Sequence, residues 1–221
     1  MAMEQELIAA VKAGNVEEVA RLLDAHPELV AARGDNGASA ILLAVYHSRP
    51  AVAQVFVDHG APLDIFEASA LGRVDRIVSL LKEDPARVSA YAPDGFYPVG
   101  LAAFFGHLDA VKALIAAGAD VRAAARNPFK VQAIHAAAAS RNVAIVRAVL
   151  EAGGDPNAQQ QQGFRPMHEA GTNGNLELAE LLVSHGGDPT LANDAGKNSI
   201  DFAKEKGHTE LVQWMEGLNR K

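Results

Sequence analysis

Apolar side chains recur along the chain at steps of three and four residues, with polar residues between them. This spacing places the apolar positions on one face of a helix, so each such stretch predicts an amphipathic helix with one buried stripe. Two examples are Leu108, Val111, Leu114 and Ile115, and Leu176, Leu178, Leu181 and Leu182. Other stretches, such as residues 135–139, are rich in alanine. Alanine favours helix and lets backbones approach closely, so these stretches predict helices that pack tightly on their neighbours.

The two kinds of helix alternate in pairs, and the residue that joins the members of a pair recurs with a nearly constant period. The joining residues are Gly14, Ser48, Gly72, Gly106, Arg141, Gly174 and Gly207. A period of about 33 residues predicts a stack of helix pairs in which each repeat contacts only its neighbours. We expect an all-α solenoid of about seven helix-turn-helix pairs with short β-hairpin loops.

One step of the period, between Ser48 and Gly72, is much shorter than all the others. A second series of positions marks the connecting loops, at Gly37, Gly95, Lys130, Gly163 and Gly196. Its irregular step, from Gly37 to Gly95, spans the same place and is shorter than two full periods. We therefore expect the third repeat to lack its preceding hairpin, which leaves a notch in the row of loops.

The repeats are expected to form a single domain over residues 1–221, because no linker rich in proline, glycine or serine divides the chain. One pair of short helices cannot bury enough apolar surface to offset its own ordering, so the stability must come from the interfaces between repeats. The expected repeats span residues 4–34, 35–63, 64–91, 92–126, 127–159, 160–192 and 193–221.

Three segments, 93–123, 132–158 and 163–189, carry a motif that resembles the ankyrin repeat. The pattern of that family runs Asp-x-x-Gly-x-Thr-Pro-Leu-His-x-Ala-Ala-x-x-Gly-His, followed by an apolar helix and Gly-Ala-Asp, and the resemblance covers nearly the entire chain. The Thr-Pro-Leu-His box reads SAIL, YPVG, QAIH, RPMH and NSID in this sequence, so its threonine is never present. The resemblance implies that this threonine and histidine tie neighbouring loops by hydrogen bonds, so we expect loops less rigid than in consensus repeats.

Composition and charge limit the classes of partner that we expect for this chain. Aromatic residues make up only 5% of the chain, within an apolar fraction of 49% that suits close-packed small helices. The net charge of -7 disfavours nucleic acid and anionic membranes. The first residues carry Glu4, Glu6 and Lys12, so they do not resemble a secretion signal, and no apolar run is long enough to predict a membrane span. We expect a cytoplasmic protein with neither nucleic acid nor membrane as partner.

Catalytic and metal chemistry is not favoured. The chain has no cysteine, which removes disulfides, thiolate catalysis and cysteine-based zinc sites. His135 and His168 occupy the same position in successive repeats, which indicates hydrogen bonding at a loop or helix start. After His168-Glu169, Thr172 stands where a zinc hydrolase needs its second histidine. We expect no metal, no cofactor and no enzymatic activity.

The resemblance implies that a partner lies along the concave face, formed by the loop tips and the first helix of each pair. Aromatic residues gather at the variable positions of that face in the middle of the chain, and exposed apolar patches commonly mark interaction sites. The alternative is that Phe104 and Phe105 fill the gap left by the missing hairpin and that the loop phenylalanines cover neighbouring loops. The candidate partner-binding residues are Tyr46, His47, Leu71, Phe96, Tyr97, Phe104, Phe105, Phe129, Phe164, Thr172 and Asn173.

The sequence therefore predicts a non-catalytic protein-protein interaction module, an adaptor or regulator whose preformed surface orders little on binding. Alanine at Phe96 and Phe164 is expected to weaken binding while changing thermal stability little. A small-ligand-binding or enzymatic protein with a pocket at the irregular third repeat is the alternative, which an enclosed cavity with convergent polar groups would favour. A monomer is expected, and self-association through the aromatic residues stays open. The sequence does not identify the partner.

Overall fold

The computed structural model describes residues 2–35 and 37–218. Residues 219–221, the end of the seventh expected repeat, lie outside the described residues. The helices are α1 (Ala2–Ala13), α2 (Val16–Ala25), α3 (Ala40–Tyr46), α4 (Pro50–Asp58), α5 (Ile65–Ala70), α6 (Val74–Glu83), α7 (Pro98–Phe104), α8 (Leu108–Ala116), α9 (Ala133–Ala139), α10 (Val143–Glu151), α11 (Pro166–Asn173), α12 (Leu176–Ser184), α13 (Ser199–Glu205) and α14 (Thr209–Leu218). Within residues 2–35 and 37–218, three short 3₁₀ helices lie in the connecting loops, η1 (Pro27–Ala31), η2 (Pro85–Ser89) and η3 (Gln161–Gly163).

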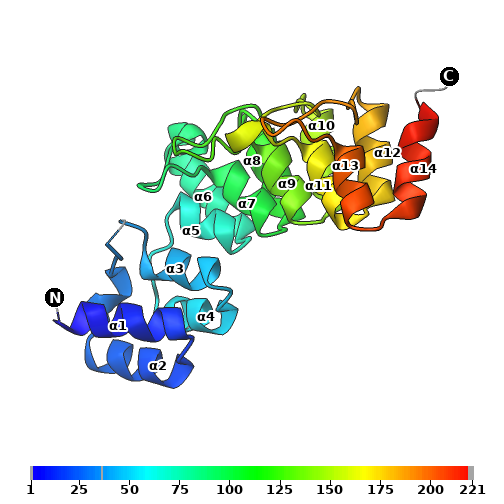
Figure 1. The fold of residues 1–221 in the computed structure, drawn as a ribbon. Helices are drawn as coiled ribbons and strands as arrows, with labels where there is room; N and C mark the ends of the chain where they lie inside the picture. Colours follow the sequence, from blue (N-terminus) through cyan, green and yellow to red (C-terminus); the bar gives the residue numbers. More distant parts are fainter. Residues whose placement is uncertain (1, 36, 219–221) are drawn as a thin grey trace.

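In the part of the chain that the structure describes, the helices form seven antiparallel pairs stacked side by side, which confirms the predicted all-α solenoid. The first helices pack against one another in one layer and the second helices in another, with α7 between α5 and α9 and α8 between α6 and α10 (Figure 1). The connecting loops reverse direction as hairpin-like turns. The expected β-hairpins are therefore present only as turns: within the described residues they form no strand, and one isolated bridge pairs Arg33 with Ser39.

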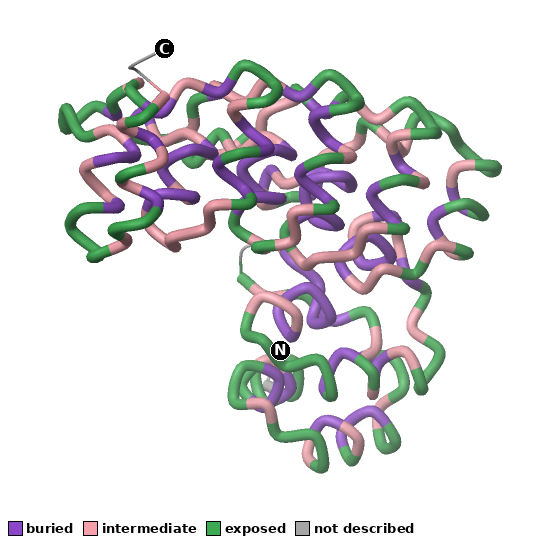
Figure 2. Tube along the Cα trace, turned by 90° about the vertical axis from the view of Figure 1, so that its right-hand side faces the viewer, coloured by how far each residue is buried: buried purple, intermediate pink, exposed green. Residues whose placement is uncertain are grey.

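The core lies between the two layers and runs along the whole stack, as Figure 2 shows. The second helices bury most of the stripes that their spacing predicts, including Val111 and Leu114 of α8 and Leu178 and Leu182 of α12. The other predicted stripe positions Leu108, Ile115 and Leu176 are half-buried. The alanines of α9 are buried except for the last, so this helix lies close to both neighbours. Each repeat thus depends on the next for burial of its apolar side chains.

The glycine and histidine of the motif link neighbouring repeats at two places in the stack. Gly72 and Gly174 take a left-handed backbone with φ of 65°, and an added Cβ would lie 2.6 Å and 2.5 Å from the Nδ1 atoms of His107 and His208. Each ring sits over the glycine of the previous repeat, with its Nε2 atom 2.9 Å and 3.1 Å from a carbonyl oxygen of the first helix in that repeat. Glycine is required here for both conformation and space.

The notch predicted at the third repeat is present. Only residues 59–64 join α4 to α5, whereas residues 84–97 join α6 to α7. The helix start is fixed instead by a capping box: the Asp64 carboxylate accepts the Glu67 backbone N–H at 3.0 Å, and Glu67 Oε2 accepts that of Asp64 at 2.7 Å. Burial, aided by the Asp64 charge, raises the pKa of Glu67. In Figure 1 the helices α1–α4 lie offset from the row α5–α14 at this point.

Two histidines of the Thr-Pro-Leu-His box keep the loop ties that their spacing predicts. The His135 Nδ1 atom accepts the backbone N–H of Gln132 at 3.1 Å, so Nε2 carries the proton and donates to the Ala158 carbonyl at 2.9 Å. The His168 ring makes the same two contacts, with Arg165 N at 2.9 Å and the Leu191 carbonyl at 3.1 Å. These rings hold the start of a helix to the loop of the next repeat. None of the described helices is both long and apolar enough to cross a membrane.

Gln132, at the position of the missing threonine, offers a test of this arrangement. Its Oε1 atom is buried without a hydrogen-bond partner. Threonine here has a hydroxyl that can accept the backbone N–H of His135 and removes the unpaired oxygen. We expect Gln132→Thr to raise the free energy of unfolding by about 1 kcal/mol, the usual value of a helix N-cap. Urea unfolding would measure it, and an unchanged or lower stability would contradict this account.

Candidate functional site

A hollow of about 430 Å³ lies on the face formed by the loops and the first helices, around α7, α9 and α11. Its lining is mostly apolar and includes aromatic rings from both sides of α9. The lining residues are Tyr46, Phe96, Tyr97, Gly100, Leu101, Phe104, Val131, His135, Ala136, Ala138, Ala139, Gln160, Phe164, Arg165, Pro166 and Glu169. The volume lies within the range of pockets that enclose ligands.

The hollow exists because the central helix, α9, has only small side chains where its neighbours have large ones. Ala136 occupies the repeat position that holds Leu101 in α7 and Glu169 in α11. Ala139 likewise occupies the repeat position that holds Phe104 in α7. The alanines form the floor of the hollow, and the larger side chains of the flanking helices form its walls.

Three aromatic residues pack across the notch. The Tyr46 ring, at the end of α3, stacks on Phe105 with centroids 6.0 Å apart and lies 6.3 Å from Phe96. Its hydroxyl donates to Asp94 Oδ2 at 2.8 Å. Burial is the main cause that raises the pKa of Tyr46, and the hydrogen bond to Asp94 raises it further. These contacts lie across the place of the missing hairpin. The alternative given from sequence is that Phe105 fills this gap, and the structure places both Phe105 and Phe96 there, against Tyr46.

Phe104 and Phe164 are differently placed. The Phe104 side chain is 51% exposed and lies edge-on to Phe105, with centroids 5.1 Å apart. Phe164 is half-buried against His168 and Phe202, at 5.4 Å and 5.5 Å. It also lines a neighbouring hollow of about 500 Å³ toward the last repeat, so it forms a wall between the two.

The remaining candidates divide in two groups. Tyr97 lines the hollow but is only 3% exposed, because its ring fills the space over Gly100, where an added Cβ would lie 3.0 Å from the ring. Phe129 is 54% exposed in the loop before α9, but it does not line the hollow. Also outside the lining are His47, Leu71, Phe105, Thr172 and Asn173.

Sequence reasoning did not assign Leu101, Ala136, Gln160, Arg165 or Glu169 to the site. The signal that finds three of them is the size of side chains at equal positions in successive repeats. Leu101, Ala136 and Glu169 follow one another by one repeat each and form one such row. A small residue between two large ones in this row marks the hollow.

Several polar groups that line the hollow already make hydrogen bonds within the protein. Burial lowers the pKa of His135 to about 4, so its ring is neutral near pH 7. The Arg165 Nη1 atom donates to the Asn157 carbonyl, and its Nε atom is buried without a partner. The Glu169 Oε1 atom accepts the side-chain N–H of Asn173 at 2.5 Å. Among the described residues, no group of three or more His, Asp or Glu side chains is placed to hold a metal ion.

A wider hollow of about 780 Å³ lies at the notch, between the end of α4, residues 61–63 and the start of α6. Its two arginines are engaged in the structure itself. The Arg73 Nη2 atom donates to Gln54 Oε1 at 2.7 Å, and the Arg76 Nε atom donates to the Leu63 carbonyl at 2.9 Å. These contacts join the third repeat to the second where the hairpin is missing.

Comparison with known proteins gives a family match for the part of the chain from residue 65 onward. No curated protein sequence matches the chain. A sequence model described as Ankyrin repeats (3 copies) matches residues 65–160 and again residues 134–217, together more than half of the chain. The match begins at Ile65, the first residue of α5, directly after the notch.

Proposed function

The chain belongs to the ankyrin repeat family, and from this premise we propose that it binds a protein partner in the hollow around α7, α9 and α11. Ankyrin repeat domains are generally protein-protein interaction modules, and the family is typically non-catalytic. In the proposed function the seven repeats act as one domain, an adaptor or regulator that presents a preformed surface.

The observation that carries this proposal is the apolar hollow with an exposed phenylalanine at its wall. A ring exposed next to a concave apolar surface loses contact with water when a partner covers it, and such central aromatic residues supply much of the binding energy in protein interfaces. The hollow is formed by helices whose backbones are held on both sides, so little ordering is needed on binding. Phe104 is the clearest such ring.

Phe104 and Phe129 make a matched pair for a binding test, because both are about half exposed but only Phe104 lines the hollow. Proteins retained from native cell extract on the immobilised wild type would be compared with those retained on Phe104→Ala and Phe129→Ala. We expect Phe104→Ala to weaken retention about tenfold and Phe129→Ala to leave it within about twofold. Both side chains are exposed, so both variants should keep the melting temperature of the wild type.

Equal retention by the wild type and Phe104→Ala, with Phe129→Ala weakened, would place the partner on the loops and contradict the proposal.

The structure also favours replacing Phe104 over replacing Phe96, which the sequence suggested. Phe96 packs against Tyr46 across the notch, so alanine at Phe96 is expected to lower stability as well as binding. Phe104 avoids that ambiguity.

A further inference from the structure

One wall of the hollow carries a carboxylate without a counter-ion. Glu169 of α11 lines the hollow and takes part in no ion pair among the described residues. Its carboxylate accepts one hydrogen bond, from the Asn173 side chain. The nearby Arg165 is held by the backbone of the preceding loop, because its Nη1 atom donates to the Asn157 carbonyl. The carboxylate therefore faces an apolar hollow whose lining arginine, Arg165, forms no ion pair with it among the described residues.

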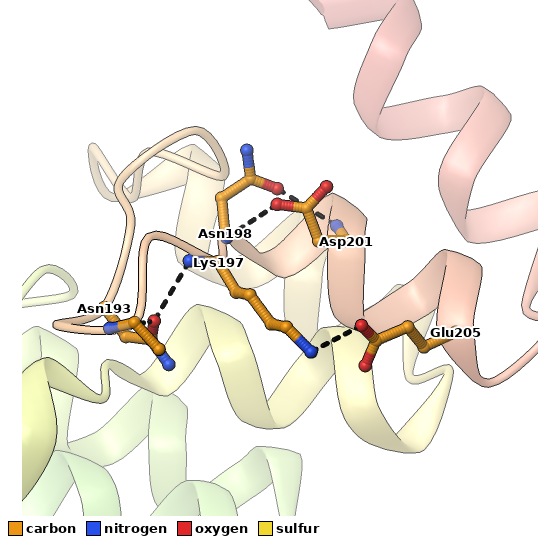
Figure 3. A network of polar contacts seen from close by, with 6 residues as sticks. Asn193, Lys197, Asn198, Asp201 and Glu205 are labelled. Atoms are coloured by element: carbon orange, nitrogen blue, oxygen red, sulfur yellow. Dashed lines mark hydrogen bonds and ion pairs between the residues drawn. The ribbon is translucent and has the colours of Figure 1, made fainter.

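The seventh repeat brings a ring, an acid and a base together, although at different repeat positions, since Phe202 there occupies the position of Glu169. The Lys197 Nζ atom lies 2.6 Å from Glu205 Oε1 and 5.9 Å from the centre of the Phe202 ring. Figure 3 shows the lysine extended along the helix to reach Glu205. A cation is attracted both to the face of an aromatic ring and to a carboxylate, and the two attractions add when one side chain reaches both. Here the chain supplies the ring, the acid and the base itself.

The hollow supplies the rings and the acid, and its lining base, Arg165, donates to the Asn157 carbonyl and forms no ion pair with Glu169 among the described residues. At the position that Lys197 holds in the seventh repeat, the sixth repeat has Phe164 instead. Phe164 and Phe104 line the hollow together with Glu169, and Ala136 and Ala139 leave the space between them open. The lysine that closes the arrangement in the seventh repeat thus has no equivalent around the hollow.

We propose, on the basis of the proposed function, that the hollow accepts a basic side chain of the protein partner. The methylene stem of a lysine or arginine lies against the rings of Phe104 and Phe164, and its charged end meets Glu169. The hollow of about 430 Å³ has room for an apolar neighbour of that residue as well. The net charge of -7 favours approach of a basic segment.

A random peptide library displayed on phage supplies the probe, because the partner is unidentified. A peptide selected on the wild-type protein would be synthesised twice, once with its basic residue and once with glutamine there. We expect the glutamine peptide to bind the wild type about tenfold more weakly, and Glu169→Gln to lose that distinction. Glu151→Gln, which removes an exposed charge at the end of α10, is the control and should keep it.

Ala139→Phe separates failure of this proposal from failure of the proposed function. Ala139 is exposed and α7 carries Phe104 at the same position, so the larger side chain is tolerated while it fills the floor. If Ala139→Phe blocks peptide binding but Glu169→Gln leaves it unchanged, the proposal of a basic side chain is wrong, whereas the hollow remains the docking site. Peptides indifferent to Ala139→Phe would overturn both. A dimer that Ala139→Phe dissociates would assign the hollow to a second copy and overturn the proposal.

Discussion

Replacing Gly171 with alanine is expected to lower the free energy of unfolding by about 3 kcal/mol, the upper end of what overpacking costs. Gly171 lies inside α11, and an added Cβ would lie 2.3 Å from the backbone oxygen of Ser199, the first residue of α13. A backbone oxygen cannot rotate away, so α13 must shift. The gain in helix propensity of about 1 kcal/mol opposes this loss and is outweighed.

The sequence alone favours the opposite result. At this repeat position α7 has Ala103 and α9 has Ala138, and both are buried. By analogy, alanine at 171 looks like a return to the usual residue. The structure shows that α11 and α13 approach more closely than that analogy allows.

Gly217→Ala is the matched control. Gly217 lies in α14, and an added Cβ there meets no atom within 4 Å. It should raise stability by about 0.5 kcal/mol, because alanine restricts the unfolded chain more than glycine does. Urea unfolding of both variants would decide, and a Gly171→Ala protein as stable as the wild type would show that α13 moves at little cost.

Much of the fold follows from the sequence because the period fixes which residues repeat. The buried stripes determine where the second helices lie, and the short step from Ser48 to Gly72 locates the notch without any contact being known. The hydrogen bonds of His135 and His168 follow in the same way, since one period relates two equal environments. These are local or periodic properties.

The site depends on relations between repeats that no local pattern records. The Tyr46 hydroxyl donates to Asp94 of a later loop, across the place of the missing hairpin. Tyr97 occupies a position expected to face a partner, yet its ring is buried over Gly100. The hollow itself appears only when Ala136 is compared with the residues facing it from the adjacent helices.

Acidification is expected to destabilise the protein through its buried histidines. Burial lowers the pKa of His135 from 6.5 to about 4 and also lowers the pKa of His168. Between these values the unfolded chain binds the proton and the folded chain does not, so stability rises with pH. The stabilisation is complete above about pH 6.5 and is lost as the pH falls toward about 4. Over that window His135 alone accounts for about 3 kcal/mol.

The contribution of His135 can be isolated with His135→Gln, which keeps a donor for the Ala158 carbonyl but does not titrate. Titration of the carboxylates is common to both proteins and cancels in the difference between their unfolding free energies. We expect that difference to favour the wild type near neutral pH and to shift toward the variant by about 3 kcal/mol on acidification to about pH 4. His168→Gln should shift in the same direction, because its ring is buried in the same arrangement one repeat later. A difference independent of pH would mean that the folded protein protonates His135 as readily as the unfolded chain does, and that its loop tie tolerates a charged ring.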